Sequence, residues 1–146
     1  MDRDRAGIKG PSTIRVGRAV VGVGVVRVGC LFRVGGETVW APSAEAGRLY
    51  VGMTKCLAAG GGRATGVRTV AEDVFEIDPQ PFDTLVEVAY KEYFASTNRV
   101  YRSQLHGWLL TSLVLLARAG VTVTPSTDEE REFVEHICEH AKAMPS

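Results

Sequence analysis

Two histidines near the C-terminus have the spacing that zinc sites on helices use. His136 and His140 are four residues apart, and Glu139 completes the order His-x-x-Glu-His. On a helix both imidazoles would share one face, as in an inverted zinc-peptidase signature. Such a site needs a further protein ligand downstream, and no carboxylate follows Glu139. Glu132, one turn earlier, could add only incidental affinity. We therefore expect no metal cofactor, and His136 and His140 are weak candidates only.

The glycine-rich loop at 60–66, Gly-Gly-Gly-Arg-Ala-Thr-Gly, has a composition that suggests phosphate binding. A P-loop has Lys directly after its last glycine, where this chain has Val67. A dinucleotide-binding turn follows a strand and precedes a helix, whereas here a helix is expected before the loop and an extended piece after it. We interpret the loop as a flexible linker and expect no cofactor. The sequence shows no pairing of a nucleophile with a base, so it assigns no catalytic residue.

An acidic stretch is the strongest remaining candidate for a functional surface. Between Glu72 and Glu92 the chain has seven carboxylates and one lysine. A solvated acidic face is the simplest interpretation. The alternative is a docking surface for a basic protein partner, because clustered carboxylates repel one another and a basic surface relieves that repulsion. The candidate partner-binding residues are Glu76, Asp83 and Glu87, together with Trp40 and Ser43 at a second corner.

Composition sets limits on the partner and the compartment. The chain has 146 residues and equal numbers of acidic and basic side chains, but residues 1–29 hold six basic and two acidic ones. The remainder therefore has a net charge of −4, which disfavours nucleic acid as a partner because phosphate binding needs clustered Lys and Arg. The three cysteines are far apart and form no Cys-x-x-Cys pair, so we expect free, mostly buried thiols in a cytoplasmic protein.

Residues 1–29 differ in composition from the rest, with Arg, Val and Gly dominating. An export signal is one interpretation, but no small-x-small cleavage site follows the apolar part. A strand is another, weakened by three glycines within it. We favour a third, that these residues are an N-terminal extension arising from a start codon placed too early, and that one globular domain occupies 30–146. On this hypothesis, deleting 1–29 leaves the melting temperature nearly unchanged.

Periodicity predicts the elements that position these residues. Short strands are expected at 31–34 and 37–40 around Gly35-Gly36, and another at 74–77. A helix over 44–58 begins after Ser43, with Ala46, Leu49, Tyr50, Met53 and Leu57 as its buried face. A second begins at Pro79, a third covers 102–119, and a last one covers 128–143 after a Thr127–Glu130 capping box.

The helix at 102–119 is the predicted centre of the domain. From Trp108 to Ala117 only Thr111 and Ser112 are polar, so the helix must be covered on nearly all sides. The apolar run is too short to cross a membrane, because Arg102 and Arg118 bracket it and a span needs about 20 apolar residues. We expect no membrane association.

Several short motifs resemble a known family. They are Phe32 to Ser43, with Trp40-Ala41-Pro42-Ser43, then Glu72 to Pro79 ending Ile77-Asp78-Pro79, and Gly107 to Gly120. Their order and spacing resemble a family of short actinobacterial proteins, domain of unknown function 6086. Ala41 departs from the Asn typical of that position. The resemblance covers about 30–124 and implies no established activity.

Together these patterns predict an α+β domain with a small antiparallel sheet of two or three short strands against about four helices. For function we hold two hypotheses from different classes. The first is a non-enzymatic interaction or regulatory module with a protein partner. The second is a small hydrolase or transferase whose active site the sequence does not reveal. The oligomeric state is left open.

Overall fold

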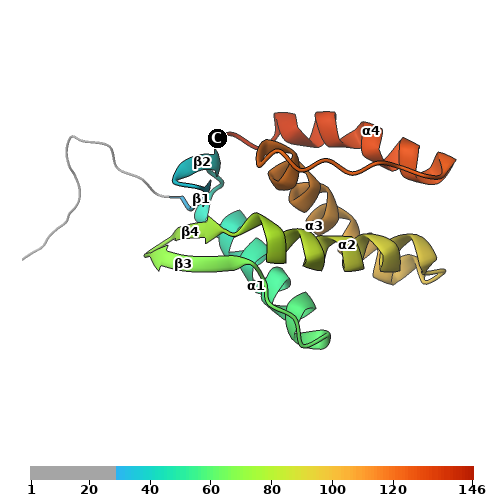
Figure 1. Ribbon diagram of the computed structural model, residues 1–146, viewed down its shortest axis with the longest axis horizontal. Coiled ribbons are helices and arrows are strands. Elements are labelled where there is room, and N and C mark those ends of the chain that lie inside the picture. Colours follow the sequence, from blue (N-terminus) through green and yellow to red (C-terminus); the bar gives the residue numbers. More distant parts are fainter. Residues whose placement is uncertain (1–28) are drawn as a thin grey trace, which may run out of the picture.

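The computed structural model describes residues 29–146, which form an α+β domain (Figure 1). The prediction for residues 1–29 lies, except for Gly29, outside the described residues. The strands are β1 (Leu31–Val34), β2 (Glu37–Trp40), β3 (Val67–Ala71) and β4 (Val74–Ile77). The helices are α1 (Ala44–Gly60), α2 (Pro79–Ala95), α3 (Arg99–Arg118) and α4 (Asp128–Lys142). The α+β class is confirmed.

The sheet differs from the predicted one in size and in direction. Its order is β2-β1-β4-β3, so it has four strands rather than two or three. The β1–β2 and β3–β4 pairs are antiparallel, but β1 and β4 are parallel, so the expectation of an antiparallel sheet was wrong. Parallel neighbours need a crossover connection, here α1, and such a long-range pairing has no local sequence signal. The β1–β2 turn is as predicted, since Gly35 and Gly36 both have positive φ.

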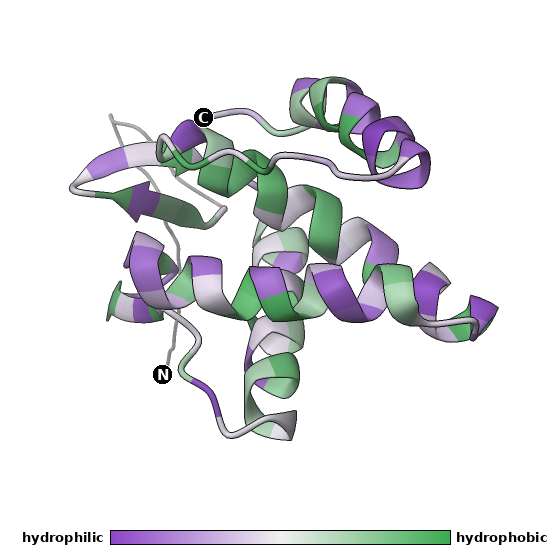
Figure 2. Ribbon diagram, turned by 45° about the vertical axis from the view of Figure 1, so that its right-hand side comes forward, coloured by the Kyte–Doolittle hydropathy of each residue, from purple (hydrophilic) through white to green (hydrophobic). Residues whose placement is uncertain are grey.

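Helix α3 forms the centre of the domain, as predicted. Nine consecutive residues, 108–116, are buried, and Leu109 is 0% exposed. Helices α2 and α4 pack against it, and α1 and β2 contact it from the side of the sheet. Figure 2 shows hydrophobic residues running through α3, whereas α4 is largely hydrophilic. No helix within residues 29–146 has both the length and the hydropathy of a membrane span.

The buried face of helix α1 overlaps the predicted one only in part, because Tyr50 is buried and Met53 and Leu57 pack partly buried against the core, but the other two predicted residues do not. Leu49 is 66% exposed and Ala46 is exposed, while Gly47, Thr54 and Ala58 are buried. Gly47 is required at its position because a Cβ there would lie 2.6 Å from the Cys30 Sγ. The buried face includes small residues that allow close approach, and a pattern that counts only large apolar residues therefore predicts a face that is partly displaced from the observed one.

Polar side chains connect α1 to α3 inside the core. The Tyr50 hydroxyl and Ser112 Oγ are 2.6 Å apart, and Trp108 Nε1 donates to Thr54 Oγ1 at 2.9 Å. Thr54 Oγ1 and Ser112 Oγ in turn donate to the backbone carbonyls of Tyr50 and Trp108. Each buried hydroxyl is thus hydrogen-bonded, which removes the cost of placing it in an apolar core.

Both ends of the described chain lie beside the segment after β2. Gly29 forms an isolated bridge with Ser43, and the Ala41 amide donates to the Pro145 carbonyl at 2.7 Å. The Met144 side chain is 3% exposed, which anchors the C-terminal residues to the core. The C-terminus accordingly lies next to β2 in Figure 1.

The cysteines are free, but the expectation that most are buried was wrong. Cys30 is buried, whereas Cys56 and Cys138 are exposed. These two lie on the solvent sides of α1 and α4, where the helices present polar residues.

Candidate functional site

A cleft lies between α2 and the α3–α4 connection. It has a volume of about 480 Å³. Its residues come from α2, from the C-terminal half of α3, from the connection 121–126 and from the start of α4. They are Asp83, Val86, Glu87, Tyr90, Lys91, Phe94, Leu113, Leu116, Val121, Thr122, Val123, Thr124, Ser126 and Glu130.

The floor of the cleft is apolar. Val86 on α2 and Leu113 and Leu116 on α3 are buried, with exposed fractions of 1%, 5% and 3%. The two helices bury these residues because each presents an apolar face to the other. An apolar floor of this kind can accept a hydrophobic side chain and release the water that covers it.

The α2 rim is charged. Asp83, Glu87 and Lys91 are spaced four residues apart, so they follow one side of the helix. Glu87 forms an ion pair with Lys91 at 3.5 Å, at the i, i+4 spacing that favours such pairs on a helix. Asp83 is half-buried and has no ion pair or hydrogen bond within residues 29–146. Partial burial and the nearby charge of Glu87 both raise the pKa of Asp83.

The opposite rim is held in place by Glu130. The Tyr90 hydroxyl donates to Glu130 Oε1 at 2.9 Å, and Ser126 Oγ donates to Glu130 Oε2 at 3.1 Å. Burial, together with the hydrogen bond to Glu130 and the charge of its carboxylate, raises the pKa of Tyr90. Burial opposes the charge of Glu130, but hydrogen bonds from Tyr90, Ser126 and Thr127 outweigh it, so the pKa of Glu130 is lowered. Glu130 thus connects α4, the 121–126 connection and α2.

The structure separates the residues that the sequence placed on one acidic face. Asp83 and Glu87 both line the cleft. Glu76 lies in β4, where it is 3.4 Å from Arg33 Nε and accepts a hydrogen bond from the Gly36 amide at 3.2 Å. Within residues 29–146, three of the seven carboxylates between Glu72 and Glu92, at positions 73, 76 and 87, have cationic partners.

The second predicted corner consists of residues with structural contacts. Trp40 is 6% exposed and stacks on Phe32 with ring centroids 4.9 Å apart. The Ser43 side chain accepts a hydrogen bond from the Ala46 amide at 3.2 Å and so caps α1. The sequence reasoning missed Tyr90 and Glu130. From the sequence, Glu130 is recognisable only as the glutamate of a capping box, and Tyr90 only as a tyrosine on the apolar face of a helix. Neither pattern indicates a cleft.

The two C-terminal histidines lie in different environments. His136 is exposed, whereas His140 is half-buried with its Nε2 2.9 Å from Thr111 Oγ1 of α3. Burial, and to a smaller extent the nearby His106, lowers the pKa of His140. Within the described part of the chain no three His, Cys, Asp or Glu side chains gather as a metal site would require. His140 helps to dock α4 on α3.

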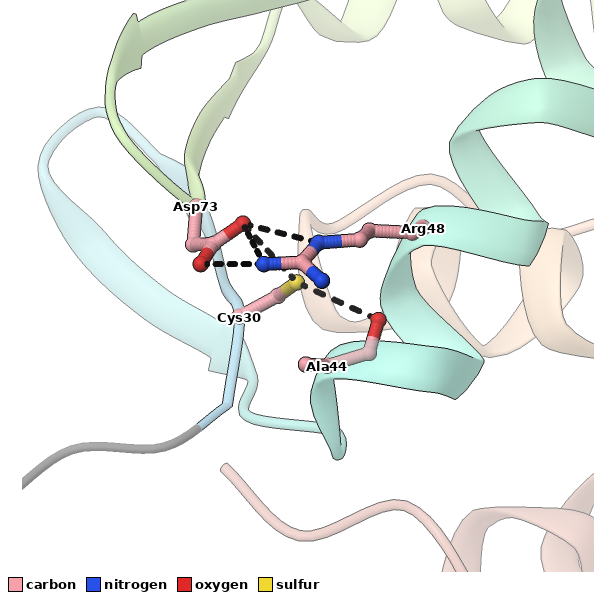
Figure 3. Close-up of polar contacts among 4 residues, drawn as sticks. All are labelled: Cys30, Ala44, Arg48 and Asp73. Atoms are coloured by element: carbon pink, nitrogen blue, oxygen red, sulfur yellow. Dashed lines mark hydrogen bonds and ion pairs between the residues drawn. The ribbon is translucent and has the colours of Figure 1, made fainter.

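A second polar cluster surrounds Cys30 (Figure 3). Asp73, in the β3–β4 turn, accepts hydrogen bonds from Arg48 of α1 through both carboxylate oxygens, the shortest at 3.0 Å. The Cys30 Sγ lies 3.9 Å from Asp73 Oδ1 and 3.8 Å from the Ala44 carbonyl oxygen. Burial and the Asp73 carboxylate raise the pKa of Cys30. A thiol held in its protonated form is a poor nucleophile. The contacts of the cluster connect the residue before β1, helix α1 and the β3–β4 turn.

By its fold and its cleft, the protein is a small α+β protein whose central helix supports a cleft with an apolar floor and an acidic rim. Residues 28–146 match the family described as "Family of unknown function (DUF6086)", and the chain belongs to that family. This confirms the resemblance seen in the sequence motifs. A search of curated proteins and a search of solved structures each returned no match.

Proposed function

We propose that this protein is a non-enzymatic interaction module that binds a basic segment of a protein partner in the cleft beside α2. The observation that carries the proposal is the Asp83 carboxylate, which is half-buried above an apolar floor and lacks a cationic partner within residues 29–146. The cleft contains three carboxylates and one ammonium group, so its net charge is −2. A ligand with both an apolar and a cationic group complements this surface.

Physical reasons favour a charged protein segment as the occupant. A carboxylate in a partly dry environment is poorly solvated, and a Lys or Arg replaces the lost hydration with a charge-assisted hydrogen bond. An apolar side chain on the floor adds about 25 cal/mol for each Å² removed from water. Complementary charge also accelerates association, which suits a regulatory contact.

The second candidate is a small hydrolase or transferase, and the raised pKa of Asp83 is the observation that favours it. In that case Asp83 would act as a general acid or base. The residues of the cleft include hydroxyls but no thiol and no imidazole. No hydrogen bond joins Asp83 to a potential nucleophile within residues 29–146. Binding therefore remains the function that the geometry supports best.

The test is affinity capture from the native host with the immobilised full chain, followed by titration of the captured partner. Asp83→Asn together with Glu87→Gln should weaken binding at least tenfold, because two charged contacts are lost. Glu135→Gln on the exposed side of α4 is the matched control and should bind as the unmodified chain does. Glu76→Gln distinguishes the cleft from the broader acidic face, and we expect no effect.

Salt provides an independent test of the same proposal. Raising the ionic strength to about 0.5 M should weaken the interaction, because screening shortens the reach of surface charges. A partner whose affinity is insensitive both to salt and to the Asp83 and Glu87 substitutions would rule out the cleft. Turnover of a substrate that is lost in Asp83→Asn would instead favour the enzymatic candidate.

A further inference from the structure

The wall of the cleft opposite α2 is an extended segment, 121–126. It contains no helix, strand, turn or bend. Burial alternates along it, with Val121 and Val123 partly buried and Thr122 and Thr124 exposed. A two-residue alternation is the pattern of a β-strand, in which successive side chains point in opposite directions. The segment thus has strand character, although it lies outside the sheet.

Some backbone groups of this segment form hydrogen bonds and others do not. The Val121 amide donates to the Leu116 carbonyl at 2.8 Å, and Pro125 has no amide hydrogen. Within residues 29–146, the amides and carbonyls of Thr122, Val123 and Thr124 form no hydrogen bond. In an extended chain, residues i and i+2 present their amide and carbonyl groups at the same edge. Thr122 and Thr124 therefore offer two donors and two acceptors along one edge.

We propose that the basic partner segment binds in an extended conformation, pairing its backbone with Thr122 and Thr124 as an added β-strand. This inference rests on the proposed function, and it specifies the conformation and the side-chain order of the partner. Backbone pairing supplies affinity that does not depend on sequence, and the cleft supplies the selection of side chains.

The geometry of the rim sets the side-chain order. Residues two apart in a strand are separated by about 6.6 Å and point to the same side. Residues four apart in a helix rise by about 6 Å, which is the spacing of Asp83 and Glu87 along α2. An extended segment therefore brings alternate side chains into register with the helix. We expect a Lys or Arg facing Asp83. Two positions away, where Glu87 is already paired with Lys91, we expect an apolar residue over the floor.

Pairing of two copies cleft to cleft is disfavoured, because both clefts are acidic and like charges repel. An amphipathic helix fits the apolar floor but leaves the Thr122 and Thr124 backbone groups unpaired, since a helix satisfies its own hydrogen bonds. An extended basic peptide satisfies both features at once.

The experiment begins with a library of random nine-residue peptides, displayed on phage and panned against the full chain. We expect selected sequences to place Lys or Arg two positions from an apolar residue. The strongest sequence is then synthesised twice, once unmodified and once with N-methyl groups on the alternate amides that face Thr122 and Thr124. Methylation keeps charge and side chains but removes the donors, so we expect affinity by calorimetry to fall about tenfold or more.

Amide hydrogen exchange locates the contact directly. Adding the unmodified peptide to the full chain should slow exchange at Thr122 and Thr124. Thr124→Pro removes one of the two donors at a position already restricted to extended backbone by the following Pro125, and should weaken peptide binding. Thr124→Ser retains the amide and is the matched control.

The outcomes separate this inference from the proposed function. If the methylated peptide binds as tightly as the unmodified one, and Asp83→Asn still weakens both, the charged cleft stands and strand addition is overturned. If Asp83→Asn and Glu87→Gln have no effect on the selected peptide, the proposed function fails. Selection of helix-forming peptides, selection of none, or protection of Thr122 and Thr124 that depends only on protein concentration would each overturn strand addition.

Discussion

At Asp83 the proposed function conflicts with stability, because the charge that would bind a partner is unfavourable in the folded protein. Its carboxylate lies above the apolar floor, close to the charge of Glu87, and both effects raise its pKa. A group whose pKa is raised in the folded state favours the fold below its unfolded pKa, and this contribution is lost as pH rises through the folded pKa. Binding sites commonly retain such unfavourable groups because a ligand relieves them.

The first prediction follows from the raised pKa of Asp83. Asp83→Asn should raise the melting temperature at neutral pH, because the variant never carries the unfavourable charge. The advantage should shrink as the pH falls from the raised folded pKa toward about 4, and it should vanish below about 4, where the carboxyl is protonated in both states. Thermal melts of the full chain across this range measure it. A variant that is less stable at neutral pH would show that Asp83 has a stabilising contact.

His140 has the opposite dependence on pH. Its pKa is lowered from 6.5, first by burial and then by the charge of His106. The neutral imidazole is therefore favoured in the fold, and stability is lost as pH falls from the unfolded pKa toward the lower folded pKa.

The second prediction is that His140→Gln reduces the loss of unfolding free energy between about pH 7.5 and 5.5. The Gln amide cannot be protonated in this range and can still bond to Thr111 Oγ1. Urea denaturation at both pH values provides the measurement. His136→Gln, on the exposed side of the same helix, is the matched control and should retain the wild-type dependence.

At the scale of elements, α3 determines the stability of the domain. Leu109 is fully buried, whereas Leu49 on α1 is 66% exposed. The same substitution, Leu→Ala, should therefore have different effects on stability at the two positions. The third prediction is that Leu109→Ala costs about 2–5 kcal/mol of unfolding free energy, as buried leucines do. Leu49→Ala should stay within about 0.5 kcal/mol. Chemical denaturation compares the two, and equal losses would contradict the central position of α3.

The elements also show which parts of the fold were predictable from sequence. The turn at Gly35-Gly36, the Ser43 cap and the uniformly apolar run of α3 are local signals, and each is present in the structure. The β1–β4 pairing depends on residues more than 40 positions apart, and β3 is recognisable mainly through its pairing with β4. The small-residue face of α1 is determined by its neighbours rather than by its own hydrophobicity.

The candidate site was predictable only in part, for the same reason. Asp83 and Glu87 are separated by one helical turn and could be recognised together. Glu130 and the 121–126 segment join them through tertiary contacts alone. Glu76 is close to Asp83 in sequence, but it lies in a strand and is paired with Arg33. Charge density along a sequence therefore overstated the size of the acidic surface.

At the scale of the whole molecule, the last residues contribute to the core. Met144 is 3% exposed, and the Pro145 carbonyl accepts a hydrogen bond from Ala41. The fourth prediction is that removing residues 144–146 lowers the unfolding free energy by about 2–3 kcal/mol, mainly through loss of the buried Met side chain. Met144→Leu preserves most of the apolar volume and should cost less than about 1.5 kcal/mol. Denaturant titrations of the two variants provide the comparison.

The bonds from Gly29 to Ser43 and from Pro145 to Ala41 have a topological consequence. Both ends of the described chain are attached to one three-residue segment, which spans at most about 7 Å. The domain is therefore suited to circular permutation. A chain that begins after Gly61, joins residue 146 to residue 29 through about six glycine and serine residues, and ends at Gly61 should fold with the same circular dichroism spectrum. Exposed loops tolerate new termini, and Gly61 is exposed.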